Sequence, residues 1–303
     1  MHGLSEERKG ELYLAGEIFL WGFFPVVVVL SYASVPTFLS LAWSTAFAAV
    51  FFGLVIAYKN LWHEFRNTLM WRYVLISTFF IGILYYGFYF AGLVHTTPGN
   101  AALIGQFEVF TAFAFFNVWR KEHFTFEYRV GALLMIIGVL TVLSPNFTGI
   151  NLGDFLILAA TVFAPPGNFF QQKARRVASS ETILFLRSVI SVVFFFLFAQ
   201  LFHEQVSVGN LTAVILFLGI NGVLLLGLSK ILWLEAIHRI SVTKAIALGS
   251  AAPFLTLLFS WAMLGQAPTL LQLVALVPLI LGTLLLTDQI SFKRQHLTTQ
   301  IRP

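Results

Sequence analysis

The sequence has no cysteine and few charged residues. Across its 303 residues, the absence of cysteine excludes disulfides, thiolate catalysis and cysteine-ligated zinc. Asp, Glu, Lys and Arg make up only 10% of the chain, whereas about 25% is usual for soluble domains. Hydrophobic residues reach 58%, and Phe alone occurs 34 times. A soluble protein of this length could not cover its surface with so few charges, so we expect lipid to surround the chain.

Several catalytic and cofactor motifs are also missing. The sequence contains no GxxxxGK[ST] loop, no HExxH and no GxSxG, which argues against ATP-driven transport, a zinc site and a serine hydrolase. Histidines in the polar connections lack the spacing of metal ligands; they are His95, His123, His203 and His238. We therefore expect no cofactor, no metal and no enzymatic activity.

The chain consists mainly of long apolar runs. A membrane-spanning helix needs roughly 20 mostly apolar residues, whereas a barrel strand needs about 10 with alternating polarity. Ten runs of the first kind, joined by short connections, predict an all-α integral membrane protein with ten transmembrane helices. The predicted spans are 12–32, 36–58, 71–93, 99–119, 126–144, 152–172, 181–202, 211–234, 243–264 and 268–288.

Basic residues alternate along the connections. Lys and Arg occur at the N-terminus and after every even-numbered span, and the other connections have none. Because cytoplasmic connections are enriched in Lys and Arg, this pattern predicts that both termini are cytoplasmic. It also explains the net charge of +5 without nucleic acid as a partner. The residues are Arg8, Lys9, Lys59, Arg66, Arg72, Arg120, Lys121, Arg129, Lys173, Arg175, Arg176, Arg239, Lys244, Lys293, Arg294 and Arg302.

The two halves of the chain repeat each other. A shift of 144 residues lays the first five spans over the last five without a gap, so we expect repeats at 1–147 and 148–303. Basic connections overlie neutral ones, because an odd number of helices per half inverts the second half. Such 5+5 inverted repeats are typical of transporters, with the solute site near the midplane. The alternative is the self-overlap of any ten-helix protein.

Short motifs resemble the EamA-type branch of the drug/metabolite transporter superfamily over about 10–288. They are Leu20-Trp21-Gly22, Ala101-Ala102-Leu103, Lys121-Glu122-His123, Gly131 with Gly138, Phe185-Leu186-Arg187 and Pro253. Trp43, Val109 and Gln266 depart from the family pattern. The resemblance implies a ten-helix carrier of the inner (plasma) membrane that moves small metabolites or amino acids, often outward.

Ionisable residues inside the spans are the first candidates for the solute site, because each is costly in a membrane. Glu108, in the middle of span 99–119, is expected to bind a proton or a cationic group of the solute; the alternative is a neutral, hydrogen-bonded Glu. Glu17 and Lys230 are candidates that could instead reach water at the cytoplasmic end. Arg187 is expected to pair with Glu17 or another acid, or to snorkel to the interface.

Polar and aromatic residues extend this set. Gln106 and Ser250 coincide under the shift of 144 residues, and both lie in mid-span. Tyr85 and Tyr89 are four residues apart and share one helix face, as a hydrophobic or cationic solute would require. An interfacial aromatic belt is the alternative, and it fits Tyr89 better than Tyr85. Trp21 is a further candidate.

The span 152–172 contains Pro165-Pro166-Gly167. Two prolines and a glycine permit a kink, which predicts either a cavity wall carrying Asn168 and Gln171 or a packing device. Asn221, a single polar residue in an apolar run, is expected to form an interhelical hydrogen bond.

These observations favour a secondary transporter that works by alternating access. We expect it to export a small metabolite or amino-acid-like solute, driven by solute or proton gradients. We expect a small solute, membrane lipid and protons as partners, and either a monomer or a weak dimer. Two other classes stay open. A membrane-embedded lipid-handling protein would need paired catalytic groups near one interface, and a sensor or assembly subunit would have a tight partner and no solute flux.

Overall fold

The computed structural model describes residues 5–32, 35–120, 125–144, 151–205, 211–240, 242–287 and 289–290, and all regular structure in these ranges is helical. The motif at 121–123 and the basic residues Lys293, Arg294 and Arg302 lie outside the described residues.

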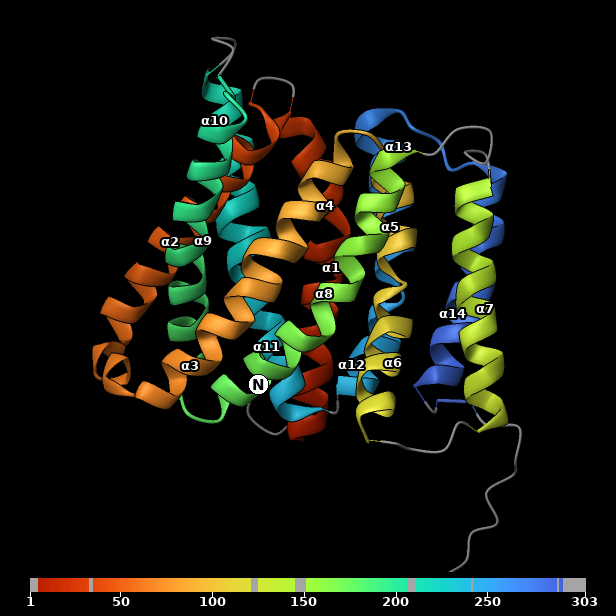
Figure 1. Ribbon diagram of the computed structural model, residues 1–303, viewed down its shortest axis with the longest axis horizontal. Helices are drawn as coiled ribbons and strands as arrows, with labels where there is room; N and C mark the ends of the chain where they lie inside the picture. Colours follow the sequence, from red (N-terminus) through yellow and green to blue (C-terminus); the bar gives the residue numbers. More distant parts are fainter. Residues whose placement is uncertain are drawn as a thin grey trace, which may run out of the picture.

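Nine helical segments of this part of the chain are long and apolar enough to cross a membrane. The tenth, α14 (Leu270–Leu286), has 17 residues, or about 26 Å, which is still enough to span. The prediction of ten transmembrane helices is therefore confirmed. The helices form one bundle, in which α1 begins and α14 ends at the same end (Figure 1).

The first half contains five spans, the third and fourth of which are composite. Its first helix begins six residues before the predicted start, because Ser5 caps the helix and two glutamates follow in its first turn. The elements are α1 (Glu6–Ser31), α2 (Thr37–Lys59), the 3₁₀-helix η1 (Leu61–Arg66), α3 (Thr68–Ser77), the π-helix η2 (Thr78–Tyr85), α4 (Tyr86–Leu93), α5 (Pro98–Gly105), α6 (Glu108–Arg120) and α7 (Phe126–Leu143).

The second half repeats this organisation in the opposite orientation. Its elements are α8 (Leu152–Arg175), α9 (Ser180–Leu201), α10 (Leu211–Gly219), the π-helix η4 (Ile220–Leu228), α11 (Ser229–Arg239), α12 (Val242–Gly249), α13 (Ala252–Leu264) and α14. The helix α8 continues through Pro165 and Pro166, so the expected irregularity does not break the helix there.

The breaks lie in the fourth and ninth spans instead. The helix α5 ends at Gly105 and α6 begins at Glu108, while α12 ends at Gly249 and α13 begins at Ala252. A shift of 144 residues carries the first break onto the second. The π-helices η2 and η4 also overlap under this shift. Each repeat therefore has the same two irregularities, and π-helical turns and interrupted helices are frequent at functional sites.

The packing between the halves follows the same symmetry. Equivalent helices meet in two pairs, α2 with α9 and α7 with α14. The first helix of each half packs against the third and fourth spans of the other, so that α1 contacts α11 and α13 while α8 contacts α3, α4 and α6. Large apolar side chains remain exposed along the outer helix faces, including Leu54, Leu197 and Val277. Such an exterior suits lipid.

Candidate functional site

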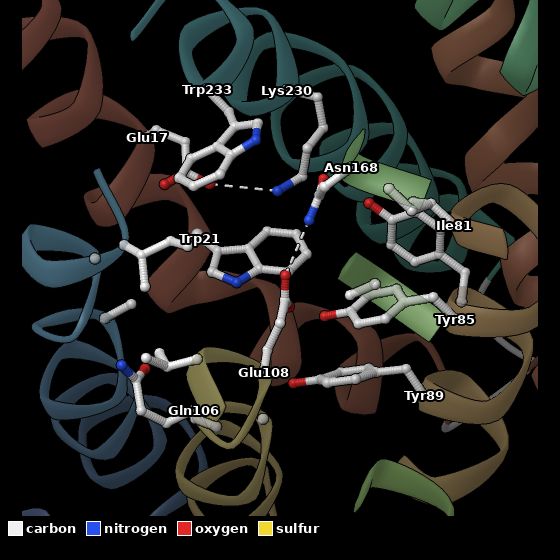
Figure 2. Close-up of a pocket in the computed structure, with 18 of the residues that line it drawn as sticks. Glu17, Trp21, Ile81, Tyr85, Tyr89, Gln106, Glu108, Asn168, Lys230 and Trp233 are labelled. Atoms are coloured by element: carbon white, nitrogen blue, oxygen red, sulfur yellow. Dashed lines mark hydrogen bonds and ion pairs between the residues drawn. The ribbon is translucent and has the colours of Figure 1, made fainter. Parts of the chain in front are cut away.

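A cavity of about 160 Å³ lies between the two halves, where the helix breaks meet α1, α4, α8 and α11. It brings together every predicted site residue except Ser250, and Figure 2 shows most of them. The predicted residues that line it are Glu17, Trp21, Tyr85, Tyr89, Gln106, Glu108, Asn168, Gln171, Arg187 and Lys230. Residues from six of the ten spans that are far apart in the sequence thus share one space.

Lys230 contacts both an acid and an aromatic ring of α1. Its Nζ lies 3.3 Å from Glu17 Oε1 and 3.2 Å from the centroid of the Trp21 ring. The Trp21 ring stacks on Phe24, with 4.2 Å between ring centroids. Lys230 is 9% exposed and Glu17 is 4% exposed. The two side chains therefore point inward, and neither reaches water along the helix surface as the alternative required.

Two further charged side chains are held by amides of α8. Asn168 Nδ2 donates a hydrogen bond to Glu108 Oε1 at 3.0 Å, and Arg187 Nη1 donates one to Gln171 Oε1 at 2.9 Å. Asn168 and Gln171 are three residues apart and share one helix face. The expected pairing of Arg187 with Glu17 is wrong, because Lys230 is the ion-pair partner of Glu17.

Three tyrosines, Tyr85, Tyr86 and Tyr89, line the cavity. The rings of Tyr85 and Tyr89 are nearly parallel, with 5.7 Å between their centroids, so the shared helix face is confirmed. Both are buried, which makes the interfacial-belt interpretation of Tyr89 wrong. The π-helix η2 ends at Tyr85, and η4 ends two residues before Lys230. The irregular turns therefore set the direction of cavity side chains in both halves.

The helix breaks contribute backbone to the cavity. Gly105 and Gly249, which end α5 and α12, both line it. Gln106 also lines it and donates through Nε2 to Thr283 Oγ1 at 3.3 Å. Ser250 is buried, and its Oγ donates to the Ala247 carbonyl oxygen at 2.7 Å. The expectation that Ser250 faces the cavity therefore fails, because its hydroxyl turns back to a carbonyl of the preceding helical turn.

Two aromatic lining residues were missed as site candidates. Trp233 lies three residues after Lys230 on α11, and Tyr86 coincides with Lys230 under the shift of 144 residues. Helical spacing from Lys230 and the repeat register were the signals that could have identified them. Asn221 forms its expected interhelical hydrogen bond, in which Nδ2 donates to Ser44 Oγ at 3.0 Å.

Within the described ranges, no three His, Asp or Glu side chains are grouped so that they could hold a metal ion. The lining itself consists of two acids, two cationic side chains, amides and aromatic rings, which can bind a small polar or charged molecule.

Comparisons with known proteins agree with the fold. The model of the EamA-like transporter family matches residues 8–144 and again residues 151–288. A solved crystal structure, described only as that of a protein, is similar with a TM-score of 0.69 and 20% sequence identity. That match covers 92% of this chain and 96% of the other, and it concerns the fold alone. No curated protein sequence matches the chain.

Proposed function

Because this chain belongs to the EamA-like transporter family, we propose that it exports a small zwitterionic solute such as an amino acid across the inner (plasma) membrane. The two inverted halves move about the cavity in alternating access. The basic connections support cytoplasmic termini, because Lys59, Arg66 and Arg72 belong to the segment that leads from α2 into α3, at the end of the bundle where α1 begins (Figure 1).

One observation carries the choice of solute. Glu108 and Arg187 are each hydrogen-bonded to a neutral amide, and neither has an ion-pair partner among the described residues. A buried charge without an opposite charge in direct contact is costly, so a ligand that supplies such a contact is favoured. An ammonium group suits Glu108 and a carboxylate suits Arg187. Because Asn168 and Gln171 lie three residues apart on α8, they hold the two groups along one helix face, where the two ends of an amino acid could meet them.

The size and lining of the cavity agree with this solute. About 160 Å³ corresponds to roughly ten water-sized groups. The tyrosine rings and Trp21 supply apolar surface for a side chain, and their faces also attract an ammonium group.

Competition in reconstituted vesicles tests the proposal. A panel of amino acids is compared with their methyl esters, which lack the carboxylate, and their N-acetyl derivatives, which lack the ammonium group. We expect each derivative to compete at least about tenfold more weakly than its parent, because a hydrogen bond to a charged group contributes about 1.5–3 kcal/mol. Equal competition by parent and derivatives would contradict a zwitterion site.

Proton coupling is tested at Glu108. In proteoliposomes, Glu108→Gln keeps an acceptor for Asn168 but cannot carry a proton. We expect it to abolish the response of uptake to a pH gradient, while solute exchange continues only at higher solute concentration because the variant binds the ammonium group more weakly. Glu204→Gln is the matched control, because Glu204 accepts hydrogen bonds from the Phe38 and Leu39 amides outside the cavity. Unchanged coupling in the Glu108 variant would remove Glu108 from the mechanism.

A further inference from the structure

The ammonium group of Lys230 occupies a small site made by α1. Its Nζ sits over the Trp21 ring at 3.2 Å from the centroid and 3.3 Å from Glu17 Oε1. An aromatic face together with a carboxylate is a typical arrangement for binding an ammonium ion. We propose that Trp21 and Glu17 form an ammonium subsite, separate from Glu108, which Lys230 fills from within the protein as a tethered ligand.

The position of Lys230 explains how the subsite stays filled. Lys230 follows the π-helix η4, whose irregular turns set the direction of its side chain into the cavity. The ammonium group is attached to α11 in the second half, whereas Trp21 and Glu17 lie on α1 in the first. The contact therefore joins the two halves that must move relative to each other.

This tethered ammonium has a consequence for the empty carrier, which rests on the proposed transport through the cavity. To return without solute, the carrier must reorient while Glu17 remains buried. An unpaired carboxylate in that position is costly, and Lys230 supplies the opposite charge at every stage when no solute is present. Lys230 thus permits net flux, in which the carrier returns empty, in addition to exchange of one solute molecule for another.

Chemical rescue tests the subsite directly. Lys230→Ala removes the side chain beyond Cβ, and propylammonium chloride matches the lost atoms. We expect propylammonium to raise the melting temperature of the purified variant and to leave the wild type unchanged, because its subsite is filled. Propan-1-ol, which has the same size and no charge, should have no effect. Trp21→Leu in the Lys230→Ala background should weaken propylammonium binding by about threefold to thirtyfold.

Flux measurements test the role of the tether. In vesicles, Lys230→Ala should lose most net efflux into solute-free medium and regain it with propylammonium. Exchange should continue, because the ammonium group of the solute can pair with Glu17 in the vacant subsite. The double variant Glu17→Gln/Lys230→Ala has no charge to pair, so it should show net efflux without propylammonium. Lys59→Ala is the control, because Lys59 pairs with Glu181 at 2.5 Å outside the cavity, and the ratio of net efflux to exchange should not change.

The outcomes separate this inference from the proposed solute. Propylammonium binding to Lys230→Ala supports the subsite even if no zwitterion is transported, and transport without propylammonium binding overturns the subsite alone. If Lys230→Ala does not fold, the folding of Glu17→Gln/Lys230→Ala shows whether Lys230 acts through charge pairing or through packing. A double variant that folds supports charge pairing, whereas one that also fails shows that Lys230 acts through packing and overturns the proposal.

Discussion

Glu64 illustrates how one carboxylate joins separate segments at one end of the bundle. It lies on η1 and accepts hydrogen bonds from the Ser179 amide at 3.0 Å and the Ser179 hydroxyl at 2.7 Å, next to the first turn of α9. Burial alone raises the pKa of Glu64, but hydrogen bonds from Thr182 and Ser179 outweigh burial, so the pKa lies below the usual value for glutamate. The ionised form is therefore the one that stabilises the fold.

The lowered pKa of Glu64 determines how the stability of the fold changes with pH. A lowered pKa contributes stability above the pKa of the unfolded chain, about 4.3, which is lost as pH falls through the lower folded value. Glu64→Gln should therefore cost about 1 kcal/mol of unfolding free energy near pH 7, and this difference should shrink below about pH 4. Thermal unfolding in detergent from pH 3.5 to pH 7.5 measures it. A difference that stays constant across this range would mean that the charge of Glu64 is unimportant.

At the scale of helices, hydropathy identified the spans but not their interruptions. Transfer free energy depends on side chains, and it is the same for a continuous helix and for one broken at Gln106. The prolines at 165 and 166 were the stronger sequence signal, yet α8 continues through them while α5 and α12 end at glycines. The recurrence of Gly105 at Gly249 under the shift of 144 residues was the available signal. A break depends on backbone hydrogen bonding, which composition does not report.

Glycines in the π-helical region offer a test of element packing. A Cβ on Gly222 would lie 2.3 Å from the Ser44 carbonyl oxygen of α2, whereas a Cβ on Gly219 would meet nothing within 4 Å. Gly222→Ala should therefore cost about 1–3 kcal/mol through overpacking. Gly219→Ala, three residues away, should be neutral or stabilising by up to about 1 kcal/mol. Thermal unfolding of both variants measures this, and equal midpoints would contradict the close approach of η4 to α2.

For the whole molecule, symmetry was the most informative property of the sequence. The shift of 144 residues relates α2 to α9 and α7 to α14, but it does not say that these equivalent helices touch, as they do in the structure. The residue types inside the spans identified ten side chains that line the cavity, but the partners of those side chains depend on distances between helices. The pairing of Lys230 with Glu17 rather than Arg187 with Glu17 is such a case.

The charges around the cavity also determine how the carrier responds to membrane voltage. Glu17, Glu108, Arg187 and Lys230 line the cavity, and they sum to zero when all four are ionised. Moving one elementary charge through 100 mV changes the free energy by about 2.3 kcal/mol. Neither the empty carrier nor one loaded with a zwitterion then moves net charge. The electric field acts only on an ion that accompanies the solute, so a current during turnover would count the protons carried in each cycle.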